Sequence, residues 1–472
     1  MILVIAEKPS VAQSIAKVLG ATSRKDGYME GGNYIVSWCF GHLVELADAS
    51  SYDERYAKWR YDDLPIVPEN WMFEVTKDKA QQFKVLSSLM KDKRVTDLVC
   101  ATDSGREGEL IFRLVYNKAG CTKPFKRLWI SSLEDSAIRE GFQHLRDGKE
   151  YDRLYEAALS RSKADWIVGI NGTRLFTTLY HKKLVVGRVQ TPTLAMLVER
   201  DGKISTFHKE KYFNVHVGKG DLTADLEKVK TEEEAKRIAA ACEKKQAVVS
   251  SLKRETKTVN PPKLYDLTTL QREANRYYGF TAQQTLDLVQ TLYEKKLLTY
   301  PRTDSQFITD DMEDTARQVI SIVCRQFPLF SGVLVTPDIA RVTDNSNVTD
   351  HHAILPTVQL EKQDVSALPQ SEQKILNLVG MRLLCATGEK HTYAETQISL
   401  SCESYTFKTK GKTVVQNGWK AIEELFKASL KTKEKDDPMK SLPEVHEGDV
   451  LDGVSASVTE HFTTPPKQYT ED

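Results

Sequence analysis

A tyrosine and an arginine stand two positions apart in the segment 298–306, which reads Leu-Thr-Tyr-Pro-Arg-Thr-Asp-Ser-Gln. Residues two apart in a strand point to the same face, so a strand here would direct Tyr300 and Arg302 toward one ligand. A phenol can attack phosphorus, and a guanidinium can hold the charged oxygens of a phosphate. Three short polar side chains follow and can hold further phosphate oxygens: Thr303, Asp304 and Ser305. The segment therefore predicts a phenolic nucleophile, Tyr300, next to an arginine, Arg302, that holds the charged phosphate oxygens.

Acidic residues follow two predicted strands near the N-terminus. Glu7 comes directly after the apolar run at residues 2–5, and an acidic run from Asp103 to Glu109 follows the one at 97–102. Ligands bind at the carboxyl ends of strands in α/β sheets, and carboxylates gathered there can share a hard cation such as Mg²⁺. The alternative is that Glu107 and Glu109 only complement a helix N-terminus while Glu7 is a solvated loop acid.

Attack by Tyr300 needs help from neighbouring groups, because a free phenol has a pKa of about 10. A cation must favour the phenolate, and a general acid must protonate the leaving oxygen. Arg302 and Lys8 can supply the cation, and Glu7 can supply the acid. A lone tyrosine is nevertheless more often a core or rim residue than a nucleophile.

Histidines provide further candidates. His351 and His352 adjoin in the segment Asp-His-His-Ala-Ile-Leu-Pro-Thr at 350–357, and one of them could contact the phosphate. Adjacent histidines elsewhere are usually polar surface. His42, within Phe-Gly-His-Leu at 40–43, is equally ambiguous.

The spacing of apolar residues divides the chain into parts. Residues 1–150 alternate short apolar runs with amphipathic stretches, which is typical of an α/β layer. Residues 151–210 have helical periodicity, interrupted by a loop through Gly187. Residues 211–262 and 391–462 change to a period of two, which favours one β domain interrupted by an insertion. The segment from Lys431 to Pro443 is charged and poor in apolar residues, so we expect a surface loop there.

The insertion at 263–390 has its own pattern. Two expected capping boxes, Thr268 with Gln271 and Thr281 with Gln284, predict two helices on either side of a turn at Gly279. A short strand carrying Tyr300 should follow. Helix-turn-helix units of this kind often bind DNA.

Composition limits the kind of protein. The 472 residues suggest about three domains, and 66 Lys and Arg balance 66 Asp and Glu, so any polyanion must bind in a local basic groove. Seven dispersed cysteines without a Cys-x-x-Cys pair favour reduced thiols over disulfides or zinc. Without a signal-peptide core or an apolar run of bilayer length, we expect a soluble intracellular protein.

Five motifs in order resemble those of a type IA DNA topoisomerase, specifically the bacterial topoisomerase III branch. The motifs are Glu-Lys-Pro-Ser at 7–10, Ala-Thr-Asp at 101–103 with Arg-Glu-Gly-Glu at 106–109, Gly-Arg-Val-Gln-Thr-Pro at 187–192, Thr-Tyr-Pro-Arg-Thr-Asp-Ser at 299–305 and His-His-Ala-Ile at 351–354. The resemblance covers residues 1 to about 360, and the β segments with the inserted helical unit also fit the family.

The resemblance implies a multidomain α/β plus α plus β fold in a ring-like arrangement. A toprim domain would occupy 1–150, a helical DNA-groove domain 151–210, a discontinuous β arch 211–262 and 391–462, and a helix-turn-helix-like tyrosine domain 263–390. It further implies an ATP-independent, Mg²⁺-dependent enzyme acting on single-stranded or negatively supercoiled DNA. We expect a monomer in the bacterial cytoplasm, associated with nucleoid or plasmid, with no membrane contact and with a helicase or single-strand-binding protein as partner.

The resemblance also assigns roles to residues. Tyr300 would form a 5′-phosphotyrosyl link, Glu7 would protonate the 3′-hydroxyl, Lys8 and Arg302 would stabilise the charged phosphorane, and His351 would support the scissile phosphate. Mg²⁺ would bind Glu7, Asp103 and Glu107. DNA would contact His42, Arg60, Arg161, Asp165, Gly169, Gly187, Arg188, Val189, Gln190, Thr191, Thr303, Asp304 and Ser305.

The chain departs from the family pattern twice. The usual Asp-x-Asp-x-Glu reads Asp-Ser-Gly-Arg-Glu at 103–107, so Gly105 replaces a carboxylate and weaker Mg²⁺ affinity is expected. Residues 463–472 stop where relatives would return to the helical domain, so a truncated chain or a fragment is expected. Two rival functions are a noncatalytic single-stranded-DNA-binding remnant and a toprim nuclease or primase, the second of which would leave the tyrosine motif without a role.

Overall fold

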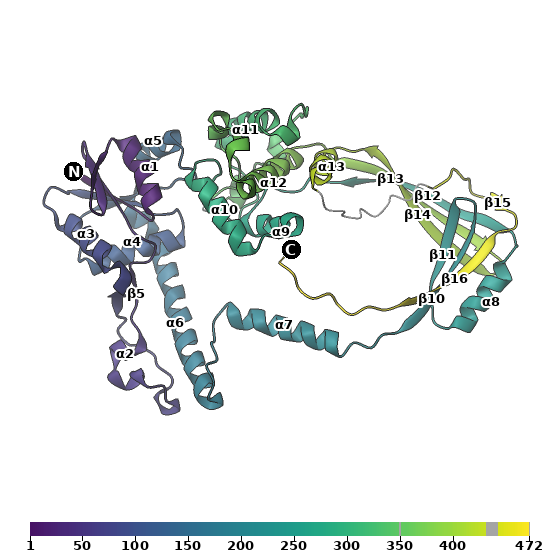
Figure 1. Ribbon diagram of the computed structural model, residues 1–472, viewed down its shortest axis with the longest axis horizontal. Helices are drawn as coiled ribbons and strands as arrows, with labels where there is room; N and C mark the ends of the chain where they lie inside the picture. The colour runs from purple at the N-terminus through teal and green to yellow at the C-terminus, as the bar shows by residue number, and fades with distance from the viewer. Residues whose placement is uncertain (349–350, 431–441, 472) are drawn as a thin grey trace.

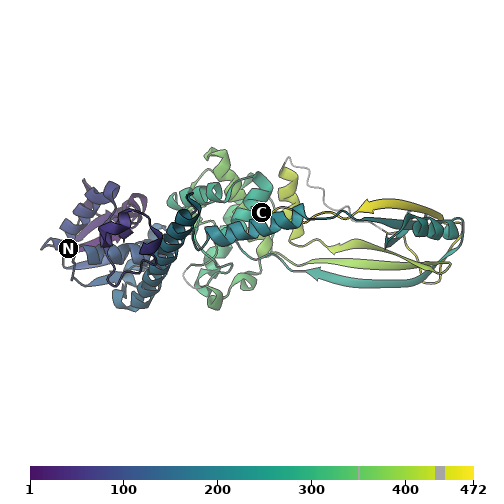
Figure 2. The ribbon, with the colours of Figure 1, turned by 90° about the horizontal axis from the view of Figure 1, so that it is seen from below.

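The computed structural model describes residues 1–348, 351–430 and 442–471, and its parts follow one another around a ring-like path (Figure 1). An α/β domain at the N-terminus adjoins a helical inserted domain, and a long β domain lies at the opposite end. Seen from below, the molecule is elongated, with the α/β domain and the β domain at its two ends (Figure 2). Of the expected surface loop at 431–443, residues 431–441 lie outside the described part of the chain.

The α/β domain is built on a seven-stranded sheet in the order β2-β3-β4-β1-β7-β8-β9. Strands β1 (Ile2–Ala6) and β7 (Asp97–Ala101) lie side by side and run parallel, as the apolar runs predict. The other strands are β2 (Ser23–Lys25), β3 (Tyr28–Gly31), β4 (Tyr34–Trp38), β8 (Phe125–Arg127) and β9 (Arg146–Asp147), and a separate pair joins β5 (Val44–Leu46) to β6 (Phe73–Val75). Alternate β1 residues enter two cores, one on each face of the sheet.

Helices connect these strands, and two of them follow the strands after which the sequence predicts them. Helix α1 (Pro9–Leu19) has proline in its first turn and ends at Gly20, whose φ of 75° is the left-handed conformation that glycine adopts without steric cost. Helix α4 (Arg106–Lys118) follows β7. The domain also contains α2 (Ala49–Tyr52), α3 (Ala80–Lys91) and α5 (Asp135–Gln143). Because β1 and β7 are neighbours, the loops before α1 and α4 meet at one sheet edge.

Two long helices follow the α/β domain. Helix α6 (Asp152–Tyr180) packs against α4, and α7 (Gln190–Ser205) runs toward the β domain without a single buried residue. The loop between them contains Gly187, as expected. No helix in the described residues is long and apolar enough to cross a membrane.

The two segments with a period of two form one seven-stranded sheet in the order β15-β12-β13-β14-β11-β10-β16. The first segment supplies β10 (Lys211–Lys219), β11 (Leu222–Val229) and β12 (Ala247–Val259), and the second supplies β13 (His391–Cys402), β14 (Tyr405–Gln416), β15 (Val450–Leu451) and β16 (Ser455–Phe462). Helix α8 (Glu232–Cys242) packs on this sheet. Helix α13 (Lys420–Ser429) lies within the second segment but buries Ile422 and Phe426 in the core of the inserted domain.

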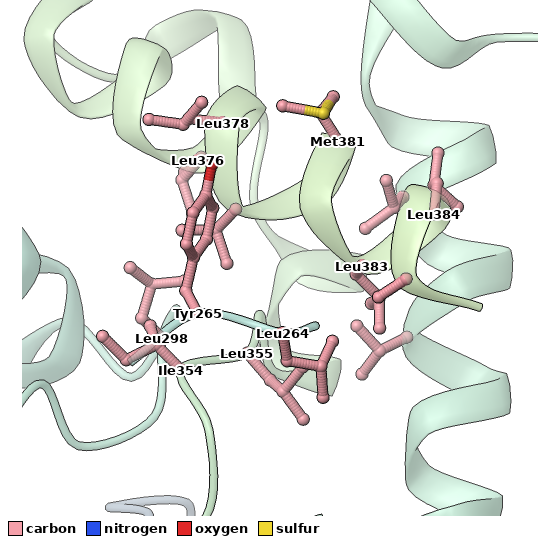
Figure 3. Packing of buried hydrophobic residues seen from close by; sticks show 14 of the residues in the cluster. Leu264, Tyr265, Leu298, Ile354, Leu355, Leu376, Leu378, Met381, Leu383 and Leu384 are labelled. Atoms are coloured by element: carbon pink, nitrogen blue, oxygen red, sulfur yellow. The ribbon is translucent and has the colours of Figure 1, made fainter. Parts of the chain in front are cut away.

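The inserted domain contains α9 (Leu267–Tyr278), α10 (Ala282–Glu294), α11 (Glu313–Gln326) and α12 (Gln370–Ala386). Figure 3 shows its core, where Tyr265, Leu298 and Ile354 pack beneath leucines of α12. The capping box of Thr281 with Gln284 is confirmed. The one at Thr268 is wrong, because Asp266 is the N-cap of α9 and accepts a hydrogen bond from the Thr269 N–H.

The expected strand around Tyr300 is absent. Its segment contains one isolated bridge, between Leu298 and Pro356, and the neighbouring Thr299 N–H donates to the Leu355 carbonyl at 2.9 Å. Residues 463–471 then run back from the β domain, where the Lys467 carbonyl accepts from Arg200 (2.6 Å) and the Glu471 carboxylate accepts from the N–H of Ala282 (2.7 Å). These contacts bring the end of the described chain to the inserted domain (Figure 1).

Candidate active site

A cleft of about 970 Å³ lies between the α/β domain, α6 and the inserted domain. Much of its lining comes from residues that the sequence singles out, although they span more than 340 positions. These residues are Glu7, His42, Asp103, Gly105, Glu107, Arg161, Asp165, Arg188, Tyr300, Arg302, Thr303, Asp304 and His351. The cleft therefore joins the acidic strand ends to the tyrosine segment.

The phenol of Tyr300 faces the acidic strand ends. Its hydroxyl donates to Asp103 Oδ2 at 3.0 Å, and its side chain is only 7% exposed. Burial raises the pKa of Tyr300 above its ordinary value, and the nearby Asp103 and Glu7 carboxylates raise it further. The expectation that cations favour the phenolate is therefore wrong for this arrangement, in which a neutral phenol donates to a carboxylate.

Glu7 and Asp103 form a close carboxylate pair at the ends of β1 and β7. Glu7 Oε2 accepts from the Asp103 N–H at 3.4 Å. Burial, followed by repulsion from Asp103, raises the pKa of Glu7 to about 7, and burial also raises the pKa of Asp103. A carboxyl group with a pKa near neutrality can both give and take a proton, so Glu7 is suited to acid–base work.

The same pair fits a hard divalent cation. Mg²⁺ is commonly held by one or two carboxylates plus water, and a cation would offset the repulsion that raises the pKa of Glu7. Glu107 instead bonds His42 Nε2 at 2.6 Å, and this hydrogen bond lowers the pKa of Glu107. Within the residues described, no group of three His, Cys, Asp or Glu side chains is arranged to hold a metal, so Glu107 would have to turn away from His42 to join the pair.

The two predicted cationic groups differ in their surroundings. Arg302 is exposed and lines the cleft. Lys8 Nζ lies 3.7 Å from Glu294 Oε1 at the end of α10. Its positive charge also acts on Glu7 and Asp103, where it opposes the rise in pKa that burial causes, so Lys8 stands near the carboxylate pair.

Both histidines are buried, so their interpretation as polar surface is wrong. His351 packs its ring against Tyr300, with a distance of 4.3 Å between ring centroids. Its Nδ1 lies 3.0 Å from the Ser131 hydroxyl, and its Nε2 contacts the Ser104 carbonyl. Burial lowers the pKa of His351 to about 4, so the imidazole is neutral at physiological pH. Burial lowers the pKa of His352 as well.

A fully buried arginine, which sequence reasoning missed, supports the acidic loop from behind. Arg127 donates to the carbonyls of Cys100 (3.1 Å), Thr102 (2.7 Å) and Asp103 (2.6 Å). Its Nε lies 3.2 Å from a carboxylate oxygen of Glu109, which is also fully buried. Glu109 thus forms a buried ion pair. The alternative that Glu109 only complements the N-terminus of a helix does not account for this pair. One arginine in a short strand gives no sequence signal for this role.

Helix α6 and the following loop form one wall of the cleft. Arg188 Nε donates to Asp165 Oδ1 at 2.7 Å, and both side chains are well exposed. Arg161 lies one turn earlier on α6 and lines the same cleft. This wall presents guanidinium groups next to the acidic strand ends.

The structure places the remaining predicted residues outside the lining. Ser305 is buried, and its hydroxyl donates to the Asn347 carbonyl at 2.7 Å, so the expectation that it holds a phosphate is not met in this arrangement. Gly169 lies inside α6, and Arg60 is exposed just before the 3₁₀ turn at Tyr61–Asp63. The others lie exposed or half-buried around the start of α7: Gly187, Val189, Gln190 and Thr191.

Comparisons with known proteins agree with the sequence motifs. Residues 149–472 match the family described as DNA topoisomerase, and residues 2–133 match the Toprim domain. Proteins named DNA topoisomerase 3 from Bacillus licheniformis and Bacillus subtilis (strain 168) are each 40% identical, over 99% of this chain and 66% of their own length. Full-length topoisomerase I from Thermotoga maritima has a similar fold, with a TM-score of 0.73 and 24% identity over 99% of this chain and 73% of that one. The chain thus spans about two thirds of the curated relatives.

Proposed function

This chain belongs to the DNA topoisomerase family and carries a Toprim domain, and on that premise we propose that it is a topoisomerase III-like enzyme of type IA. It cleaves one DNA strand through Tyr300, allows another strand to pass and rejoins the break without ATP. The observation that carries the proposal is the contact of the Tyr300 hydroxyl with Asp103 at 3.0 Å, beside Glu7. An aromatic nucleophile from one domain thereby meets the acids of another.

The residues of the cleft can carry out both halves of the reaction. Tyr300 Oη attacks the phosphorus atom, and Asp103, which already accepts its hydrogen bond, receives the phenolic proton. The bond from phosphorus to the 3′-oxygen breaks, and protonated Glu7 gives that oxygen its proton. The products are a 5′-phosphotyrosyl link and a free 3′-hydroxyl, and rejoining reverses each proton transfer. Arg302 stabilises the negative charge that the phosphoryl oxygens carry during attack.

Mg²⁺ is the cofactor we propose, and Glu7 and Asp103 would hold it with Glu107 as the third acid. When bound, it would supply positive charge that neutralises the phosphodiester. Lys8 reaches the phosphate after leaving Glu294, and His351 keeps the Tyr300 ring in place through their 4.3 Å ring contact.

Single-stranded DNA is the substrate we propose for the cleft. The lining of the cleft places Arg161 and Arg188 near the exposed Arg302 of the tyrosine segment, and such cationic groups bind the DNA backbone. Backbone and polar contacts would extend along the start of α7, with the predicted residues Gly187, Val189, Gln190 and Thr191. A helicase or single-strand-binding protein is the class of partner that would supply such DNA. Strand passage requires the inserted domain to move away from the acids, with the β domain as the flexible connection.

The decisive experiment asks which DNA end becomes attached to the protein. The chain is incubated with single-stranded oligonucleotides labelled at the 5′ or the 3′ end, then denatured and separated by electrophoresis. A 5′-phosphotyrosyl link retains the fragment that carries the 3′ label on the protein and releases the 5′-labelled fragment. Binding without any adduct would instead favour a noncatalytic single-stranded-DNA-binding protein, an alternative suggested by the missing carboxylate at Gly105.

Replacing Gly105 tests the contribution of the missing carboxylate. We expect Gly105→Asp to lower the Mg²⁺ concentration needed for DNA rejoining severalfold, because a further carboxylate joins Glu7, Asp103 and Glu107. A Cβ at this position meets nothing within 4 Å, but the φ of 157° is unfavourable for a side chain. Gly105→Ala is the matched control, since it carries the same backbone cost without the charge. Equal Mg²⁺ titrations for the two variants would contradict the expected effect.

A further inference from the structure

Ser131, in the loop after β8, contacts two parts of the inserted domain at once. Its carbonyl accepts a hydrogen bond from the Tyr300 N–H at 3.1 Å. Its hydroxyl lies 3.0 Å from His351 Nδ1. A single residue of the α/β domain thus holds the backbone of the proposed nucleophile and the imidazole that packs on its ring.

The contacts of His351 define its proton positions. Nε2 contacts the Ser104 carbonyl, which can only accept, so Nε2 carries the proton. A neutral imidazole has one protonated nitrogen, so Nδ1 is an acceptor and the Ser131 hydroxyl is the donor. Ser131 and Ser104 therefore specify one tautomer and one ring orientation of His351.

The same two serines tie the tyrosine to the acidic loop. The Ser104 hydroxyl donates to the Ile130 carbonyl and accepts from the Ile130 N–H, both at 3.1 Å. Ser104 follows Asp103 directly, and Ile130 precedes Ser131. A short path of hydrogen bonds thus runs from the Asp103 loop through Ser104 and Ser131 to Tyr300. Every contact of Ser131 with the inserted domain is lost when the two domains separate.

We propose that Ser131 is a positioning residue that orients His351 and the Tyr300 backbone, and so links docking of the inserted domain to alignment of the phenol with Asp103. The inference rests on the proposed function, in which the aligned phenol of Tyr300 attacks the DNA phosphate. Ser131 touches neither the phosphate nor the phenol oxygen, so it acts through His351 and the backbone. Its removal should slow bond cleavage at saturating DNA and leave DNA affinity unchanged.

Two readouts on the full chain test this role. Ser131→Ala should slow adduct formation about fivefold at saturating oligonucleotide, because a fivefold change in rate corresponds to the net contribution of about one hydrogen bond. The affinity for the oligonucleotide should not change. Ser131→Thr keeps the hydroxyl and should restore the rate. Ser132→Ala is the matched control, because the Ser132 hydroxyl bonds the N–H and the carboxylate of Glu134, within its own loop. Nitrogen NMR of ¹⁵N-histidine-labelled protein, with His351→Gln used to assign the signal, should show one His351 tautomer in wild type and mixed tautomers in Ser131→Ala.

The outcomes separate this inference from the proposed function. If wild type forms no adduct, the proposed function fails, while the NMR comparison still tests Ser131. If Ser131→Ala forms adduct as fast as Ser132→Ala, or its His351 signal equals that of wild type, the positioning role is refuted. In a His351→Gln background, Ser131→Ala should add little further loss, since the two residues act through one contact. Fully additive losses would also refute the inference.

Discussion

Tyr300→Phe is expected to abolish the covalent protein–DNA adduct and to leave binding of single-stranded DNA unchanged. The substitution removes only the hydroxyl, so the ring still packs against His351 and Tyr293 at centroid distances of 4.3 and 5.4 Å. Without the oxygen atom no bond to phosphorus can form, and no other group in the cleft supplies an equivalent nucleophile in our mechanism. Adduct formation should fall below detection in denaturing electrophoresis, whereas fluorescence anisotropy should report an affinity within about twofold of wild type.

Tyr293→Phe is the matched control for this variant. Tyr293 lies beside Tyr300 and is just as buried, but it does not line the cleft and has no part in the proposed reaction. The control should form adduct at nearly the wild-type rate. Residual adduct in Tyr300→Phe, or loss of adduct in both variants, would show that the nucleophile lies elsewhere or that ring substitution alone disrupts the cleft.

Tyr300→Phe should also lower the stability of the protein, which can be measured separately from adduct formation. The Tyr300 hydroxyl is a hydrogen-bond donor to Asp103, whose charged form is already disfavoured by burial. Losing that donor leaves a buried carboxylate with one partner fewer, which typically costs about 1–3 kcal/mol. A small fall in the thermal midpoint is therefore compatible with an intact cleft, and the binding measurement distinguishes it from unfolding.

Features that depend on neighbours in sequence could be predicted from the sequence. The apolar runs at β1 and β7, the proline that opens α1 and the glycine that ends it are signalled within a few residues, and the structure has them. The period of two likewise indicated β structure in segments separated by more than 120 residues, which form one sheet. The prediction of a strand around Tyr300 is wrong because distant groups hold that segment. These groups are Pro356, which forms a bridge with Leu298, and the carbonyl of Ser131.

Three pairs of side chains from distant positions could not be predicted. His42 meets Glu107, Lys8 meets Glu294, and Asp165 meets Arg188 across 65, 286 and 23 residues. Each pairing alters what its members can do, and no local spacing indicates any of them. The raised pKa of Tyr300 has a related cause, because the sequence shows that cations are available but not that burial and two acids surround the phenol.

Arg127→Met is expected to destabilise the α/β domain more than any other single substitution considered for this protein. The guanidinium is fully buried, compensates the Glu109 carboxylate and donates to the carbonyls of Cys100, Thr102 and Asp103. Removing one partner of a buried ion pair leaves an uncompensated charge and typically costs about 3–5 kcal/mol. For a domain of this size that loss corresponds to a fall of about 6–20 °C in the thermal midpoint, measurable by calorimetry. Lys126→Ala, at an exposed neighbouring position, is the control and should change stability by less than about 0.5 kcal/mol.

A double variant separates the two causes of this loss. In Arg127→Met combined with Glu109→Leu, no charge of the original pair remains buried, so part of the stability should return. The Thr102 and Asp103 carbonyls lose the donor that Arg127 supplied, whereas the Cys100 carbonyl keeps the Leu128 N–H at 2.9 Å. Arg113 also loses its contact with Glu109, so recovery should be incomplete. If the double variant is no more stable than Arg127→Met, the unpaired charge is not the main cost. The carbonyl contacts would then be the dominant role of Arg127, and the loop carrying Asp103 should lose hydrogen-exchange protection before the rest of the domain.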